Sequence, residues 1–306
     1  MDKAKSTQVI GIASGKGGVG KTTVSVNLAV ALQAMGHRVM LFDADMSLAN
    51  AQIALGCRCP FNLSHFMSGE KTLAEIIVTT RQGIKLVPGA SGIQQMAALG
   101  DIQAANIVRA FSALTDDIDY LIVDMAAGIS PEVLAFMSAC SRRFVVVRDD
   151  PSSIADAYAT IKVLIQDQGL DEIYLIPNGV YSAQEGYQLF ERINQVCARF
   201  LNRTVRYLGS IENDELILAA LKKYQPVAEF APGSAGARDF RRLAEAIRQL
   251  EPIDEASGGL QFFVERLVKT GNWTWPTPLA FTNRFKTTAK RWSWPIWAWS
   301  SAWLCT

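Results

Sequence analysis

The chain has 306 residues, of which 49% are apolar and 19% charged, and a formal net charge of +1. This length and composition predict a globular protein with one large α/β domain or two small ones, and the near-neutral charge argues against a nucleic-acid-binding chain. No apolar run reaches the roughly 18 residues that a membrane-spanning helix needs. Five cysteines without a CxxC pair, after an N-terminus with no signal-peptide pattern, predict reduced thiols in the cytoplasm.

Charge and tryptophan are unevenly distributed along the chain. All seven tryptophans and six of the Lys/Arg residues follow Glu265, which is the last acidic residue, so residues 1–265 carry 24 basic against 29 acidic side chains. We therefore expect four parts: a P-loop domain over 1–251, a linker over 252–259, a helix over 260–270, and a basic, Trp-rich, poorly ordered tail over 271–306.

Short apolar runs alternate with helical periodicity through the first part. The runs are typical of parallel strands buried on both faces, and they lie at 8–13, 38–42, 84–88, 119–124, 143–148, 172–176 and 205–211. Helical periodicity lies at 22–35, 104–114, 152–167, 183–200, 214–224 and 235–250. Strands separated by single helices predict right-handed βαβ units and a doubly wound, mostly parallel α/β sheet with helices on both faces. Ligands bind outside the carboxyl ends of such strands.

A glycine-rich loop follows the first strand. Residues 15–22, "GKGGVGKT", match the phosphate-loop pattern G-x-x-x-x-G-K-[ST] and precede a helix. Backbone amides of such a loop bind phosphate oxygens, Lys21 reaches the β/γ-phosphates, and the Thr22 hydroxyl holds Mg²⁺. The predicted phosphate-binding residues are Gly15, Gly17, Gly18, Val19, Gly20, Lys21, Thr22 and Thr23.

Acidic residues end two further strands. Asp43 and Asp45 lie one residue apart in "FDADMSLAN", so on an extended chain they point to the same side. Asp124 ends the strand "YLIVD", in the pattern of a Walker B aspartate. Carboxylates at strand ends beside a phosphate loop suit Mg²⁺ coordination and water orientation. We expect Thr22, Asp43 and Asp124 to form the metal site.

The loop carries a second lysine, Lys16, and the motif K-G-G-x-G-K-[ST] resembles the deviant Walker A box of the MinD/ParA-type ATPases. This resemblance implies a P-loop NTPase fold, ATP and Mg²⁺ as ligands, and an ATP-dependent homodimer. In that family the extra lysine contacts the partner's nucleotide, where a second positive charge stabilises the transition state. The resemblance makes Lys16, Lys21 and Asp45 the catalytic residues, with Asp45 positioning the attacking water.

The base-reading residues are also implied by the resemblance. The N-K-x-D box of guanine readers is absent. Asn178, just after a predicted strand, and Asp214 match positions at which the family contacts adenine, which favours ATP over GTP.

The resemblance covers residues 8 to about 268 and is closest to the FlhG/FleN branch of flagellar-number regulators. The segments that carry it are "VMLFDADMSLAN", "LVPGASGIQQMAAL", "VDMAAGIS", "DDPSSIADAYATIKVL" and "GGLQFFVERLV". It implies a slow, dimer-activated ATPase that acts on a flagellar transcriptional activator and on a partner GTPase that places flagella. Ser47, Met125 and Glu212 depart from the branch's pattern near the nucleotide, and the "DQAxxLR" segment that activates the GTPase is missing.

The predicted helix at 260–270 is amphipathic. Five of its apolar residues are spaced for one helix face, namely Leu260, Phe263, Val264, Leu267 and Val268. The family uses such a helix to reach the inner membrane when ATP is bound, whereas the alternative is a helix packed on its own domain.

Other functions stay open at this point. A MinD-type division-site ATPase shares the whole motif set. A ParA-type partition ATPase requires a basic stripe on a body that carries more acidic than basic residues, so we expect no sequence-specific DNA binding. An iron–sulfur carrier needs paired cysteines, and Cys57-x-Cys59 is the one close pair. A non-hydrolysing adaptor would use ATP only as a structural ligand.

Overall fold

The computed structural model of the protein describes residues 7–45, 49–90, 101–112, 114, 118–251 and 253. The predicted helix at 260–270 and the predicted tail at 271–306 lie outside these residues, as does Ser47. None of the helices in the described ranges is both long enough and apolar enough to cross a membrane.

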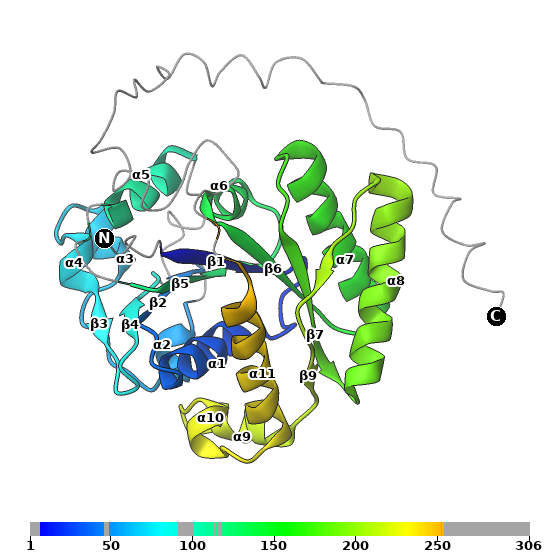
Figure 1. Cartoon of the computed structure of the whole chain (residues 1–306). Coiled ribbons are helices and arrows are strands. Elements are labelled where there is room, and N and C mark those ends of the chain that lie inside the picture. Colours follow the sequence, from blue (N-terminus) through cyan, green and yellow to red (C-terminus); the bar gives the residue numbers. More distant parts are fainter. Residues whose placement is uncertain are drawn as a thin grey trace, which may run out of the picture. The chain divides into compact units, whose positions relative to one another are not determined.

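A nine-stranded sheet forms the centre of the described chain (Figure 1). Its order is β3-β4-β2-β5-β1-β6-β7-β8, with β9 also paired to β7, and the pair β3–β4 is antiparallel whereas the other pairs are parallel. The strands are β1 Gln8–Ala13, β2 Val39–Ala44, β3 Val78–Thr79, β4 Lys85–Val87, β5 Tyr120–Met125, β6 Arg142–Val147, β7 Ile173–Val180, β8 Arg206–Tyr207 and β9 Ile211–Glu212.

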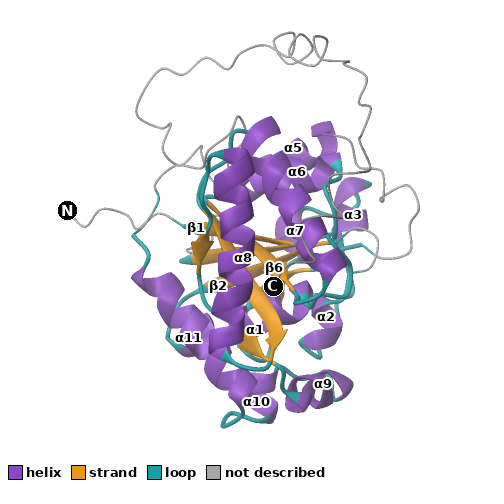
Figure 2. Ribbon diagram, turned by 90° about the vertical axis from the view of Figure 1, so that its right-hand side faces the viewer, coloured by secondary structure: helices purple, strands orange, loops and turns teal. Residues whose placement is uncertain are grey.

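Helices connect the strands and cover both faces of the sheet (Figures 1 and 2). They are α1 Lys21–Ala34, α2 Ala51–Ala54, α3 Leu63–Met67, α4 Leu73–Ile76, α5 Asp101–Ser112, α6 Pro131–Ala139, α7 Pro151–Lys162, the π-helical turn η2 Val163–Asp167, α8 Ala183–Leu201, α9 Glu215–Lys222, α10 Val227–Phe230 and α11 Ala235–Gln249. The doubly wound, mostly parallel fold predicted from the sequence is therefore confirmed.

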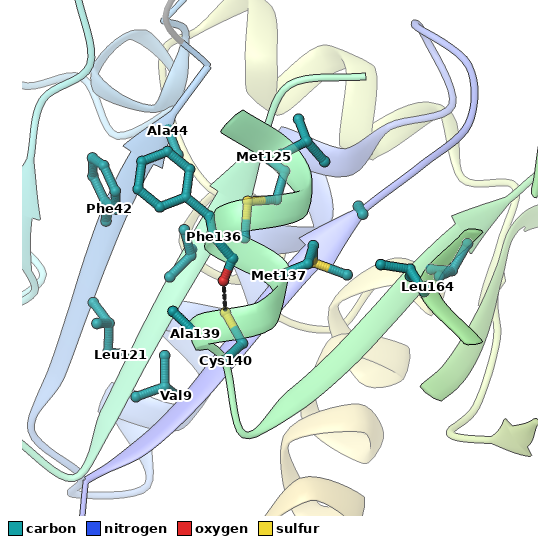
Figure 3. Close-up of a cluster of buried hydrophobic side chains, with 14 of the residues drawn as sticks. Val9, Phe42, Ala44, Leu121, Met125, Phe136, Met137, Ala139, Cys140 and Leu164 are labelled. Atoms are coloured by element: carbon teal, nitrogen blue, oxygen red, sulfur yellow. Dashed lines mark hydrogen bonds between the residues drawn. The ribbon is translucent and has the colours of Figure 1, made fainter. Parts of the chain in front are cut away.

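Two apolar cores lie on opposite faces of the sheet, because successive side chains of each strand point to opposite sides. Val9 of β1 belongs to the core with α5, α6, α7 and α8, whereas its neighbour Ile10 belongs to the core with α1 and α11. Figure 3 shows part of the first core, where Phe136 of α6 lies near Phe42 of β2. Burial on both faces explains why these strands are continuous apolar runs.

Helix α6 is a difference from the sequence-based prediction. Its nine residues are mostly apolar, and Val133, Phe136 and Met137 are buried against the sheet. A buried helix of this length lacks the polar face that periodicity detects. Its N-terminus carries Pro131 at the first helical position, which is a helix start signal independent of periodicity.

The strand predicted at 205–211 is wrong as a single element. The chain forms two short strands there, β8 and β9, which pair with different parts of β7. Gly209 lies between them with φ of 151°, and a Cβ at this position would lie 2.8 Å from Leu243 Cδ2. The backbone turns at a position that only glycine occupies without strain.

The parallel strands bring five chain segments to one edge of the sheet. The loops after β1, β2, β5, β6 and β7 all leave at the carboxyl ends, with β1 between β5 and β6. The chain moves to β2 and β5 on one side of β1 and to β6 and β7 on the other, so β1 ends at the switch point where open α/β sheets bind ligands.

Candidate nucleotide-binding site

The phosphate loop lies between β1 and α1, as predicted. Gly18 and Gly20 have φ of 79° and 97°, in the left-handed region that favours glycine. Gly20 is the N-cap of α1 and offers no side-chain cap, so the first-turn amides of this helix have no side-chain acceptor from the cap residue. This is the arrangement that binds a phosphate group at a helix N-terminus.

Hydrogen bonds of the buried residue Ser14 fix the base of the loop. The Ser14 hydroxyl donates to the Lys16 carbonyl at 2.7 Å, and the Gly128 amide, from the loop after β5, donates to the Ser14 carbonyl at 2.9 Å. Lys21, at the first position of α1, is only 8% exposed. The loop that would hold phosphates is thus joined to the loop after the Asp124 strand.

Asp43 and Asp124 lie side by side, because they are paired residues of β2 and β5. Both are buried, with exposed fractions of 1% and 0%. Asp43 Oδ1 accepts from the Asp45 amide at 3.2 Å, and its Oδ2 accepts from the Ala51 amide at 2.9 Å. The Asp43 side chain thereby joins the backbone of Asp45 to the first residue of α2.

Burial dominates the electrostatics of the two carboxyl groups. It raises the pKa of Asp43 to about 8, and the charge of Asp124 adds to this rise. Burial also raises the pKa of Asp124 to about 6, against the lowering effects of hydrogen bonds from Thr22 and Ser25 and of the Lys21 charge. Two neighbouring buried carboxylates therefore resist ionisation unless a further positive charge joins them.

The residues present fit a magnesium ion. Asp124 Oδ1 accepts from the Ser25 hydroxyl at 2.9 Å, whereas Asp124 Oδ2 is buried without a hydrogen-bond partner. Such an atom requires an explanation in a native fold, and a cation or its bound water provides one. Among the described residues no three His, Cys, Asp or Glu side chains cluster. A magnesium ion here would take its remaining ligands from Thr22, phosphate oxygens and water, which is its usual preference.

Lys16 contacts its own chain. Its Nζ donates to the Ser152 hydroxyl at 2.6 Å and lies 3.5 Å from Asp150 Oδ1. Asp150 is the N-cap of α7, and Ser152 lies in the first turn of that helix. The loop approaches α7 so closely that a Cβ on Gly15 would lie 2.2 Å from the Asp156 carbonyl oxygen. Lys16 and Asp150 are 45% and 39% exposed, so this ion pair is weak and open to exchange.

Asn178 and Asp214 have contacts within the fold. Asn178 Nδ2 donates to the Val19 carbonyl at 2.7 Å, which ties the end of β7 to the phosphate loop. Asp214 is the N-cap of α9, where its two carboxylate oxygens accept from the Leu216 and Gly236 amides, both at 2.9 Å. Burial favours a higher pKa of Asp214, but these hydrogen bonds outweigh it and keep the pKa low.

The structure adds three residues to the predicted site. Ser25 lies inside the helix predicted at 22–35, one turn after Lys21. Its polar side chain at that position is the sequence feature that could have indicated a place in the site. Asp150 and Ser152 lay in a segment that carried the family resemblance but had no assigned role. Of the residues that depart from the branch pattern, Met125 is buried beside Gly11, and Glu212 donates its amide to Asp239 Oδ2 at 3.0 Å.

Comparison with known proteins agrees with this geometry. Residues 5–248 match the ParA family, described as NUBPL iron-transfer P-loop NTPase. The chain is 41% identical to the antiactivator FleN of Pseudomonas aeruginosa, over 88% of this chain and 96% of that protein. It is 34% identical to the flagellum site-determining protein YlxH of Helicobacter pylori, over 88% and 92% of the two chains.

Solved structures match the fold. The septum site-determining protein MinD of Pyrococcus horikoshii, complexed with Mg-ADP, superposes with a TM-score of 0.67 at 26% identity, over 82% of this chain and 99% of that one. The cell division ATPase MinD of Pyrococcus furiosus gives the same TM-score at 25% identity, over 80% and 100%. The chain therefore belongs to the ParA/MinD family of P-loop NTPases, and its similarity to FleN and YlxH places it beside the flagellar members of that family.

Proposed function

We propose that the protein is an ATP-dependent dimerising switch that hydrolyses ATP slowly and regulates the number or placement of flagella. The observation that carries the flagellar assignment is the 41% identity to FleN, an antiactivator, over nearly the whole of both chains. The phosphate loop alone would fit any member of the family. The alternatives are a division-site or partition ATPase and an adaptor that binds ATP without hydrolysing it.

Different residues of the chain are proposed to carry out different parts of ATP hydrolysis. Amides of the loop over 15–20 and the Lys21 ammonium bind the phosphates and neutralise their charge. Thr22 and Asp124 would hold Mg²⁺, with Asp43 a partner of its hydration shell, and the ion would supply positive charge at the β/γ-phosphates. Asp43 supports the first turn of α2 and the Asp45 amide, and Asp45 positions the attacking water. Asn178 and Asp214 are proposed to contact adenine.

Lys16 is proposed to exchange partners when two chains meet. In the single chain it lies on Asp150 and Ser152. In the dimer it would leave this weak exposed pair and contact the phosphates bound by the other chain, where burial strengthens each charge interaction. Each site would then be completed by its neighbour, so turnover requires dimerisation.

The proposed partners are inferred from the similar proteins. We propose that the ATP-bound dimer binds a flagellar transcriptional activator, because FleN is an antiactivator. Binding of a flagellar placement GTPase is a second proposed contact, drawn from the resemblance to the branch. We propose no sequence-specific DNA contact.

Membrane recruitment is proposed for the segment 260–270, which lies outside the described residues. One short helix with five apolar residues on one face binds a bilayer only marginally, whereas two copies on one dimer gain by about 10²–10⁴ through effective concentration. Liposome sedimentation of a chain ending at Thr270 tests this. Greater sedimentation with ATP than with ADP is expected, and equal sedimentation in both states contradicts the switch.

The main experiment measures ATP turnover per chain against protein concentration. We expect turnover to rise with concentration for the wild type and to stay low and flat for Lys16→Ala, while both bind ATP. Lys222→Ala, at the end of α9, is the matched control and should behave as the wild type. Wild-type turnover that is independent of protein concentration would contradict the proposed role of Lys16 in the partner's site. ATP binding without any turnover would favour the alternative of an adaptor that binds ATP but does not hydrolyse it.

Flagellar function is tested by complementation. Expression of the chain in Pseudomonas aeruginosa that lacks FleN should restore the wild-type number of flagella per cell, counted by electron microscopy. Lys21→Ala should fail to restore it at equal protein level. Failure of the wild-type chain, despite ATP turnover in vitro, would favour a division-site or partition role.

A further inference from the structure

Two cysteines lie close together just after α2. Cys57 Sγ and Cys59 Sγ are 3.8 Å apart and share a hydrogen bond, and both side chains are half-buried. Cys140 and Cys197, by contrast, are fully buried in the other core. Of the cysteines in the described ranges, the 57/59 pair thus combines proximity with access to solvent.

The geometry of the pair suits disulfide formation. A disulfide bond is about 2.05 Å long, so the sulfurs must approach by about 1.8 Å, which side-chain rotation and a small backbone adjustment provide between residues two apart. The hydrogen bond from Cys59 lowers the pKa of Cys57, and the same bond raises that of Cys59. Cys57 is therefore the thiolate that attacks, and Cys59 the thiol that resolves.

A surface hollow gives an oxidant access to the pair. Its volume is about 520 Å³. Its lining residues are Gln52, Ile53, Cys57, Arg58, Cys59 and Pro60. Arg58 is exposed between the two cysteines, and its positive charge favours an anionic disulfide such as glutathione disulfide.

The pair is connected to the switch aspartates through α2. At one end of this short helix the Ala51 amide donates to Asp43 Oδ2 at 2.9 Å. At the other end the Cys57 amide donates to the Gln52 carbonyl at 3.0 Å, and Gly56, with φ of 62°, turns the chain against the Tyr224 carbonyl. A shift of Cys57 toward Cys59 therefore pulls on the helix that Asp43 holds.

We propose that Cys57 and Cys59 form a reversible regulatory disulfide, with a small-molecule disulfide as oxidant, and that closure of this bond displaces α2 and slows ATP hydrolysis through Asp43 and Asp45. Transient disulfides in reducing compartments are typically of this redox-sensing kind. The coupling to hydrolysis rests on the proposed function, whereas formation of the disulfide does not.

The chemistry is a balanced thiol–disulfide exchange. The Cys57 thiolate attacks one sulfur of the oxidant, forms a mixed disulfide and releases one thiolate. Cys59 then loses its proton and attacks Cys57 Sγ, which breaks the mixed disulfide and releases the second thiolate. Both cysteines are oxidised, the oxidant gains two electrons and becomes two thiols, and a dithiol reductant reverses the sequence.

Trypsin provides a direct test, because it cleaves after Arg58, between the two cysteines. The full chain is equilibrated in glutathione buffers of increasing oxidised fraction with a chelator present, alkylated, denatured and digested without reductant. We expect fragments 39–58 and 59–71 to remain linked in oxidising buffer and to separate after reduction. Cys305 lies in a different fragment, 292–306, and so does not confuse the assignment.

Single variants and turnover complete the test. Cys57→Ser and Cys59→Ser should give no linked fragments. Oxidation should reduce wild-type ATP turnover at least about fivefold, the lower end of typical coupling between sites, and leave both variants unchanged. Unlinked fragments, or a glutathione adduct on Cys57 that never closes, overturn the disulfide. A linked pair with unchanged turnover overturns the coupling. If the reduced protein shows no turnover, the proposed function fails while the fragment result still decides the disulfide.

Discussion

The two sides of the sheet edge differ in how their polar groups are satisfied. Around β2 and β5, the buried carboxyl groups of Asp43 and Asp124 have raised pKa values, and Asp124 Oδ2 has no hydrogen-bond partner. Around β7 and α9, Asn178 and Asp214 already bond to backbone groups. The first side therefore has room in its hydrogen bonding for a cation, whereas contacts within the fold satisfy the polar groups of the second side.

Lys21→Ala should have the largest effect. The substitution removes a buried cation from the phosphate side, and charged hydrogen bonds of about 1.5–3 kcal/mol each predict a loss of ATP affinity of at least about 100-fold. Isothermal titration with ATP and Mg²⁺ measures it. A matched change on the other side, Asn178→Ala, should cost less, and equal losses would erase the contrast between the two sides.

Asp45→Ala should leave ATP affinity intact and slow hydrolysis. Loss of the water-positioning carboxylate removes a transition-state interaction, which predicts a fall in turnover of about 100-fold. The variant should accumulate as an ATP-bound dimer in size-exclusion chromatography. A variant that remains monomeric, or that turns over at the wild-type rate, would remove Asp45 from this role.

The buried carboxyl pair predicts a pH dependence of stability without metal. Both groups have a folded pKa above the ordinary value near 4, so the folded state binds more protons than the unfolded chain does. The free energy of unfolding should therefore fall as pH rises from about 4 through about 6 for Asp124 and about 8 for Asp43, and level off above. Thermal melts between pH 5 and 8, without nucleotide, measure this decline.

The substitution Asp124→Asn tests whether this carboxyl group causes the fall in the free energy of unfolding with rising pH. An Asn side chain keeps one oxygen as acceptor for Ser25 and places a neutral amide where the unpartnered oxygen lies. The variant should show a flatter melting profile and a higher melting temperature than the wild type at pH 8. Glu245→Gln on α11, an exposed carboxylate, is the control and should follow the wild type. A profile as steep as that of the wild type would remove Asp124 from the decline and assign it to Asp43 or to other groups.

The contrast between the sides also explains what the sequence could predict. Strands buried on both faces are continuous apolar runs, and the phosphate loop is local in sequence, so β1, β2, β5 and the loop were found with nearly correct bounds. Short elements such as α2, α3, α4 and α10 carry too few residues for a periodic signal. Helix α6 is too buried to show a polar face. Contacts between segments that are distant in the sequence cannot be predicted from the spacing of residues along the chain.

Lys16 is the clearest case of such a contact. The motif drew attention to Lys16 as an extra lysine in the phosphate loop. It could not indicate the contact of Lys16 with Asp150, because the two residues lie 134 apart in the chain. Asp150 has a low pKa because Ser152, the Ser153 amide and Lys16 all favour its charged form. The same carboxylate caps α7, so capping and the ion pair are combined in one side chain.

The ion pair of Lys16 should give the smallest effect, and Asp150→Asn separates it from the cap. Asn is as good an N-cap as Asp, so α7 should stay intact while the charge that holds Lys16 is lost. Exposed ion pairs contribute about 0–1 kcal/mol, which predicts an ATP-dependent dimerisation constant up to about fivefold stronger because Lys16 is released. Analytical ultracentrifugation with ATP measures this constant. Ser152→Ala, which removes the 2.6 Å hydrogen bond to Lys16, should act in the same direction, and Lys16→Ala combined with Asp150→Asn should abolish the gain. Weaker dimerisation in Asp150→Asn would instead place this carboxylate at the surface that binds the second chain, and the contact with Lys16 would then have no restraining role.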